Sequence, residues 1–340
     1  MNGSLRALLS GAIDYAGMFP PASLSLEQSA DNYFRYCKTP EAWMLGRLVC
    51  PAAQLDGLAA IVESHPPPNE VRPESPGNWS IAAVLPAGAT VAEWREKLDA
   101  SLPAVRRNPL AAKIGAIEIR LPDELTLAKT YGELRGAVEP LAAALAAALA
   151  AAMLPGVVAF IEPPAAPPVP SAAHARRDDV ICWVAKAMAE FSKKRSWPAG
   201  RLALKLRTGG LSTTPYLSSA ELARVVCTFR DQGVAWKATA GLHHPMFHYD
   251  AAGGGYAPGF INLLTAAVLT DVHQLPEPEL QSLLEDENVA SFAWTKEALR
   301  WRGRSATIEQ IAAARRRAFL SFGSCSFDDP VAGLEALGWF

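Results

Sequence analysis

The chain has 340 residues, half of them hydrophobic, and its 32 basic and 34 acidic residues give a net charge of −2. This balance does not favour nucleic acid or an anionic membrane as a partner. The N-terminal segment lacks the apolar run of a signal peptide, and the most apolar expected helix, 141–154, is too short to span a bilayer. We therefore expect a cytoplasmic protein that contacts neither membranes nor nucleic acid.

Five cysteines are spread along the chain without forming a Cys-x-x-Cys pair, at Cys37, Cys50, Cys182, Cys227 and Cys325. Each lies in an apolar stretch, which predicts buried and free thiols. Free thiols are typical of a reducing compartment, and this agrees with the cytoplasmic location.

Short β-rich runs alternate with helical patterns eight times along the chain. The expected strands are 11–17, 45–50, 79–85, 113–121, 156–162, 202–207, 234–239 and 289–294. The clearest helical patterns are 25–36, 53–63, 91–98, 179–193, 219–232 and 307–319, and Ser25 with Gln28 indicates a capping box for the first of them. This alternation predicts a parallel sheet covered by helices.

Eight parallel strands with intervening helices favour an α/β fold in which residues 1–340 form a single (β/α)8 TIM barrel. An open, doubly wound sheet is the alternative architecture, but no GxGxxG motif follows the first strand to support its dinucleotide-binding form. We also expect a long excursion between strands seven and eight. Its segment 243–258 is rich in glycine and aromatic residues and is a candidate lid.

The alternation of side chains along each strand places charged residues inside the expected barrel. In 202–207 the leucines share one face, so Lys205 and Arg207 share the other, and Lys237 occupies the same place in 234–239. The same argument applied to the other strands gives the inward set Asp14, Glu118, Arg120, Glu162, Lys205, Arg207 and Lys237. Buried charges must pair with each other or line a wet pocket, so this set predicts either an internal ion-pair network or an active site.

Two inward lysines on adjacent strands suggest a specific chemistry. A lysine acts as a nucleophile only when its amine is neutral, and a neighbouring cation with an apolar wall lowers its pKa. Lys205 and Lys237 lie at matching depth, and Arg207 adds a further positive charge. The arrangement favours a Schiff base between Lys205 and a carbonyl substrate. A carboxylate paired with Lys205 would hold the proton on its amine, so we expect Glu118 and Glu162 to pair chiefly with Arg120, Arg207 or Lys237.

The motifs KLRTG, which begins at Lys205, and WKATAG, which contains Lys237, resemble those of the deoxyribose-phosphate aldolase family. The resemblance covers residues 113–241 and includes the intervening helical segment. It implies that Lys205 forms the Schiff base and that Lys237 tunes its pKa. It further implies that Glu118 takes the place of the acidic proton-relay residue, and that FIE, ending at Glu162, corresponds to the family's IIE motif.

The segment expected to end strand eight, FAWTKE, departs from the family pattern. It lacks the small residues whose backbone N–H groups would bind a phosphate. The sequence therefore does not indicate a phosphorylated substrate.

Three histidines follow the seventh expected strand, at His243, His244 and His248, with Asp250 close behind. Imidazole and carboxylate groups are ligands for divalent transition metals. Pro245 argues against the regular helix that would bring His244 and His248 to one side. A general acid–base or substrate-binding role for His243 or His244 is therefore an equal alternative to metal binding.

We predict a lyase of the class I aldolase type that forms a Schiff base with a small carbonyl substrate and needs no cofactor or metal. The expected catalytic residues are Lys205, Lys237, Glu118 and Glu162, and the expected substrate contacts are Asp14, Arg120, Arg207, Thr208, Thr239, His243 and His244. Two alternatives stay open. They are a metal-dependent hydrolase or lyase that uses the histidines, and a non-catalytic barrel that binds a small anion. The substrate's identity and the formation of a homo-oligomer are also open.

Overall fold

The computed structural model describes residues 3–64, 79–154, 156–164, 176–197, 201–209, 217–251 and 254–339. Within this part, eight parallel strands close into a barrel in the order β1-β13-β7-β6-β5-β4-β3-β2. They are β1 (Ile13–Tyr15), β2 (Leu45–Pro51), β3 (Ile81–Val84), β4 (Ile114–Arg120), β5 (Val158–Glu162), β6 (Leu202–Arg207), β7 (Trp236–Thr239) and β13 (Phe319–Ser324). The predicted (β/α)8 barrel is confirmed, and the open sheet is excluded.

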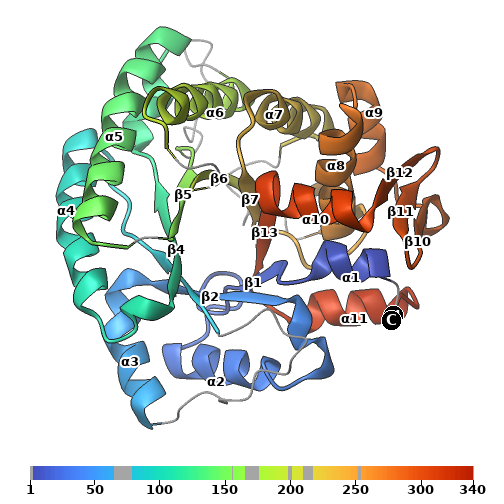
Figure 1. Ribbon diagram of the computed structural model, residues 1–340, viewed down its shortest axis with the longest axis horizontal. Coiled ribbons are helices and arrows are strands. Elements are labelled where there is room, and N and C mark those ends of the chain that lie inside the picture. The colour runs from blue at the N-terminus through green and yellow to red at the C-terminus, as the bar shows by residue number, and fades with distance from the viewer. Residues whose placement is uncertain are drawn as a thin grey trace.

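Helices surround the barrel on its outer side (Figure 1). They are α2 (Leu26–Tyr36), α3 (Leu55–Ser64), α4 (Val91–Arg107), α5 (Tyr131–Ala151), α6 (Arg177–Lys194), α7 (Ser219–Gln232), α8 (Phe260–His273), α10 (Ile308–Arg317) and α11 (Asp328–Ala336). The predicted capping box is present, since Ser25 and Gln28 exchange side-chain to backbone hydrogen bonds at the start of α2. The N-terminal helix α1 (Gly3–Leu9) lies beside α10 (Figure 1).

The prediction for the eighth strand was wrong. Residues 292–294 form β10, which pairs antiparallel with β11 (Ala298–Trp301), and β11 pairs with β12 (Arg304–Thr307) in a small sheet outside the barrel. The true eighth strand is β13, with the sequence FLSFGS; Phe319 was expected to end a helix, and no element was expected over 320–324. A single residue, Ala318, separates β13 from α10, and the serines and glycine of the strand weaken its apolar pattern.

The chain between β7 and β13 holds several further elements. A hairpin of β8 (His248–Asp250) and β9 (Gly255–Ala257) comes first, and residues 252–253 within it lie outside the described residues. Then follow α8, α9 (Glu277–Leu284), the β10–β12 sheet and α10. In the hairpin the rings of Phe247 and Tyr256 stack with centroids 5.3 Å apart, and the side chain of Tyr256 stays exposed. The role of this segment as a lid stays a prediction.

Helix α5 corrects the expectation that the most apolar helix is too short to cross a bilayer. It has 21 residues and, by length and composition alone, is the one helix of the described residues that passes the test for a membrane span. In the structure α5 lies on the outside of the barrel, where it packs against α4 and α6 (Figure 1). Its buried residues, such as Leu134, Val138 and Leu145, face the protein core.

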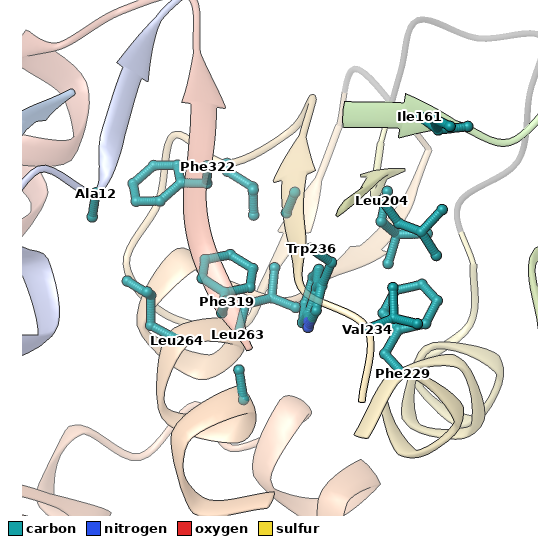
Figure 2. Close-up of a cluster of buried hydrophobic side chains, with 14 of the residues drawn as sticks. Ala12, Ile161, Leu204, Phe229, Val234, Trp236, Leu263, Leu264, Phe319 and Phe322 are labelled. Carbon is teal, nitrogen blue, oxygen red and sulfur yellow. The ribbon is translucent and has the colours of Figure 1, made fainter. Parts of the chain in front are cut away.

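The apolar layer between the strands and the helices fixes which way each strand faces. Trp236 of β7 is 2% exposed and lies between Phe229 of α7 and Phe319 of β13, with ring centroids 5.6 and 4.3 Å away. Figure 2 shows these rings with Leu204 of β6 in the same outer layer. Because successive side chains alternate, the anchoring of Leu204 and Trp236 outside turns Lys205 and Lys237 toward the barrel axis.

We expect Trp236→Ala to destabilise the protein by about 3–5 kcal/mol, because it removes the largest ring of this layer and leaves a cavity. The free energy of unfolding from urea titration measures the effect. Tyr249→Ala is the matched control, because Tyr249 is 58% exposed, and we expect its effect to stay within about 0.5 kcal/mol. Equal effects of the two variants would contradict this description of the core.

Candidate active site

The inward charges of the barrel form a continuous chain of ion pairs at the carboxyl ends of the strands. Lys205 and Lys237 are direct partners in the pairing of β6 with β7, as the sequence predicted. Glu118 on β4 lies between them, with Oε2 at 2.8 Å from Nζ of Lys205 and Oε1 at 2.7 Å from Nζ of Lys237. One carboxylate therefore links the two amines.

The deeper end of this series of ion pairs centres on Lys237, whose side chain is 1% exposed. Its Nζ donates hydrogen bonds to Asp14 of β1 and to Glu118, and it lies 5.2 Å from the ring centroid of Phe160. The Oδ2 atom of Asp14 also accepts a hydrogen bond from Ser321 Oγ at 2.7 Å, and its Oδ1 atom accepts one from the backbone N–H of Arg47 at 2.9 Å. Lys237 is thus fixed and closed to solvent.

The outer end of the series of ion pairs is partly exposed to solvent. Nζ of Lys205 lies 3.1 Å from Oε2 of Glu162, and Nε of Arg207 lies 3.4 Å from Oε1 of the same carboxylate. The side chain of Lys205 is 11% exposed, whereas that of Arg207 is 46% exposed. Exposure therefore increases from Lys237 through Lys205 to Arg207, so Lys205 is the one of the two lysines that a ligand entering from solvent can reach.

The pairing sets the protonation of these groups. Burial alone would raise the pKa of Glu118, but the charges of Lys205 and Lys237 outweigh it and lower that pKa to about 2. The pKa values of Asp14 and Glu162 are also lowered, because their cationic partners outweigh burial. Burial would lower the pKa of Lys205, yet Glu118 and Glu162 outweigh it and raise that pKa above its ordinary value.

This result corrects one condition of the sequence argument. We expected Glu118 and Glu162 to pair chiefly with Arg120, Arg207 or Lys237, which would have left Lys205 free to lose its proton. Instead both carboxylates contact Lys205 as well. The alternation of strand residues predicts which face a side chain occupies, but it does not predict which charge it meets inside. In the ligand-free protein Lys205 therefore carries its proton at neutral pH.

Acid should weaken the fold through these carboxylates. The pKa values of Asp14, Glu118 and Glu162 are lowered on folding, so the stability they contribute is present above about pH 4 and is lost as pH falls toward 2. Glu118 alone accounts for about 3 kcal/mol. We expect urea titrations to show a steep loss of unfolding free energy between pH 4 and pH 2. The loss of unfolding free energy between pH 4 and pH 2 should be smaller in Asp14→Asn than in the unmodified protein. An equal dependence on pH in that variant would contradict the pairing of Asp14 with Lys237.

Other residues expected at the site lie at its edge. Arg120 pairs with Asp123 at 3.3 Å. The hydroxyl of Thr208 faces the backbone carbonyls of Thr239 and Ala240 at 3.2 and 2.9 Å, which ties the ends of β6 and β7 together. Among the described residues, Arg120 pairs with Asp123, Arg207 pairs with Glu162, and Lys237 pairs with Asp14 and Glu118, so each of the three cations has carboxylate partners of its own.

The histidines separate into two groups. His243 turns to Asp329, with Nδ1 at 3.0 Å from Oδ2, whereas the rings of His244 and His248 lie against each other with centroids 4.2 Å apart. Burial lowers the pKa of His248, and the nearby His244 and His243 add to this effect. Among the described residues, no group of three or more His, Cys, Asp or Glu side chains is arranged to hold a metal ion. Within the part of the protein that the structure describes, His243, His244 and His248 therefore do not come together as one metal site.

Sequence reasoning missed two residues of the site. Arg47 contacts Asp14 through its backbone N–H and through its guanidinium, at 2.9 and 3.6 Å. It belongs to β2, where the strand pattern was recognised but its inward charge was not included. Ser321 was missed because the eighth strand was placed elsewhere. The two phenylalanines of FLSFGS were the available signal, but the register shifts between Phe319 and Phe322, so the strand lacks the regular alternation that would have revealed Ser321 as inward.

The true end of strand eight also changes the argument about phosphate. Its sequence, GSCS at residues 323–326, contains the small residues that FAWTKE lacks. However, Ser326 Oγ accepts a hydrogen bond from the backbone N–H of Asp329, and the first turn of α11 carries the carboxylates of Asp328 and Asp329. The carboxylates of Asp328 and Asp329 repel a phosphate at the start of this helix. A phosphorylated substrate therefore still lacks support, because of charge repulsion and not because small residues are missing.

No known family model matches the chain, and no curated protein matches it in sequence. Among solved structures, it is similar to the deoxyribose phosphate aldolase of Aeropyrum pernix, described as a unique tetrameric structure. The identity is 12%, over 71% of this chain and 80% of that chain, with a TM-score of 0.41. A protein described as an aldolase shows 10% identity over 70% and 83% of the two chains, with a TM-score of 0.40.

The chain is also similar to an N-acetyl-D-glucosamine-6-phosphate deacetylase from Mycobacterium smegmatis, at 12% identity over 82% of this chain and 75% of that chain, with a TM-score of 0.34. All of these likenesses are distant and concern the barrel alone. One of them is a structure of a deoxyribose phosphate aldolase, the family whose motifs residues 113–241 resemble.

Proposed function

We propose that the protein is a class I aldolase-type lyase in which Lys205 forms a Schiff base with a small carbonyl substrate. The observation that carries the proposal is the pair Lys205 and Lys237, in register on adjacent strands and linked by Glu118. A purely structural ion-pair network gains nothing from placing two cations side by side. The partial exposure of Lys205 and the closure of Lys237 support Lys205 as the nucleophile.

The chemistry begins with the removal of a proton from Lys205. Its neutral amine then attacks the carbonyl carbon, and the carbonyl oxygen takes up protons and leaves as water, which gives an iminium ion. Loss of a proton or of a carbon fragment from the neighbouring carbon yields an enamine, which completes carbon–carbon cleavage or bond formation. Glu118 contacts both amines and is the group placed to carry protons between them.

Glu162 contributes to this step by holding Lys205 toward Glu118 and Arg207 toward the opening. We assign substrate contacts to Arg207, Thr208 and Thr239 at the ends of β6 and β7, and to Asp14, Arg120, His243 and His244 around them. This chemistry uses only the protein's own side chains and requires no cofactor. A cytoplasmic location and a homo-oligomer remain part of the proposal, and sedimentation analysis tests the latter.

Exchange of substrate protons with solvent tests the proposed function without knowledge of the natural substrate. An enamine makes the protons on the carbon next to the carbonyl exchangeable. In D₂O at pH 8–9, NMR spectra of a panel of small aldehydes and ketones should show protein-dependent loss of these signals for at least one compound. Exchange that is equal with and without protein for every compound would contradict the proposal.

A further inference from the structure

A second cluster of reactive side chains lies at the barrel mouth, apart from the lysines. Sγ of Cys325 is 3.5 Å from Nε2 of His243, and Nδ1 of the same ring is 3.0 Å from Oδ2 of Asp329. With a proton on Nδ1, the ring donates to Asp329 and presents the lone pair of Nε2 to the thiol. Cys325 as nucleophile therefore contacts His243 as base, and His243 contacts Asp329 as the carboxylate that orients it, which is the arrangement that nucleophilic catalysis requires.

Three separate elements bring these residues together. Cys325 follows the last residue of β13, Asp329 belongs to the first turn of α11, and His243 follows β7. On β13, a Cβ added to Gly323 would lie 3.0 Å from Thr239 Oγ1, so these strand ends are in close contact. The cluster thus lies at the carboxyl end of the barrel, where barrel enzymes carry out their chemistry.

The state of the thiol differs from that expected of the cysteines from sequence. Cys325 is half-buried rather than buried, and the ring of His243 is its neighbour. The contact with Cys325 is the largest cause that raises the pKa of His243, burial opposes it, and Asp329 adds to the rise. A raised imidazole pKa makes His243 a stronger base toward the proton of the neighbouring thiol.

Other titratable groups surround the cluster. Tyr15 on β1 is close enough for Cys325 to contribute to the rise in its pKa, after burial as the main cause. Asp328 on α11 is engaged by Tyr36, whose hydroxyl donates to it at 2.8 Å, and by Arg35 at 3.3 Å. These contacts turn Asp328 toward α2 and leave Asp329 as the carboxylate on His243.

We propose that Cys325, His243 and Asp329 form a nucleophilic triad that accepts an acyl group from activated esters or thioesters. The site shares His243 with the substrate contacts assigned above but uses neither lysine, so it does not depend on a Schiff base at Lys205.

The steps balance without any co-reactant other than water. The proton of Cys325 passes to His243, the sulfur attacks the acyl carbon, and the alcohol or thiol leaves with the proton from His243. The product is a thioester on Cys325. Water then attacks this thioester with His243 as base, which releases a carboxylic acid and restores the thiol.

The test uses 4-nitrophenyl acetate at pH 7, with the release of 4-nitrophenolate as one readout and peptide mapping as the other. We expect a burst of one equivalent, with the acetyl group on Cys325 and labile to neutral hydroxylamine, as a thioester is. Cys325→Ser should abolish this thioester, and His243→Gln should slow acetylation of Cys325 by about 10²-fold, the usual contribution of a general base. Asp329→Asn should slow it by a smaller factor.

Cys37→Ser is the matched control, because Cys37 is also half-buried but burial raises its thiol pKa to about 11. This variant should keep the full burst. The proposal is overturned if acetyl groups appear on lysines alone, or if His243→Gln acetylates Cys325 at the unchanged rate. Circular dichroism of each variant verifies that the barrel is folded, so a slow rate reports on the triad.

Discussion

Lys205→Met is expected to lower the turnover of any carbonyl substrate by ~10⁴-fold or more, because it removes the only atom that forms the covalent intermediate. Methionine has a similar length, and Glu118 and Glu162 keep Lys237 and Arg207 as partners, so the barrel should remain folded. Steady-state kinetics on a substrate found by the exchange assay measures the effect.

Lys186→Met is the control for the loss of a lysine elsewhere. Lys186 lies on α6 outside the barrel, with Nζ at 4.4 Å from the ring centroid of Tyr131. This variant should keep the full rate. If Lys205→Met retained more than a tenth of the activity while folded, the reaction would not pass through a Schiff base on this residue.

Lys237→Leu is expected to slow formation of the Lys205 adduct at pH 7 by about tenfold, and the deficit should shrink as pH rises toward 10. Lys237 shares Glu118 with Lys205, so its removal leaves that carboxylate to Lys205 alone and raises the pKa of Lys205 further. Each pKa unit reduces the neutral amine tenfold. Rates of cyanoborohydride trapping across this pH range measure the effect.

Removal of Lys237 also leaves Asp14 without its buried cation, at a cost in stability of about 3–5 kcal/mol. The double variant Asp14→Asn with Lys237→Leu removes both charges of that pair and keeps the test interpretable if the single variant is unstable. Glu162→Gln should act in the opposite direction and speed trapping at pH 7, because Glu162 helps to hold the proton on Lys205. Equal trapping in all variants would contradict the electrostatic role of these groups.

The position of the site was predictable because it depends on local rules. The alternation of side chains in 202–207 and 234–239 follows from strand geometry, and it placed Lys205 and Lys237 inside the barrel at equal depth. The apolar residues on the other face, such as Leu204 and Trp236, are long and aromatic enough to make the assignment unambiguous.

The partners inside the barrel were not predictable, because they depend on the stagger of strands far apart in sequence. Glu118 reaches both lysines, and Asp14 meets Lys237 from the other side of the barrel. The same holds for the eighth strand. FLSFGS is stabilised as a strand by pairing with β1 and β7, which a local pattern does not reveal, and its misassignment also concealed the place of Cys325.

The most direct test of the central claim is borohydride trapping with a panel of small aldehydes and ketones, followed by peptide mapping of the reduced protein. We predict a single adduct on Lys205, formed slowly at pH 7 and faster as the pH rises, because Glu118 and Glu162 hold the proton on this amine. If no carbonyl compound gives an adduct, or if surface lysines are labelled to the same extent as Lys205, then Lys205 is a structural ion-pair residue and the Schiff-base function is wrong.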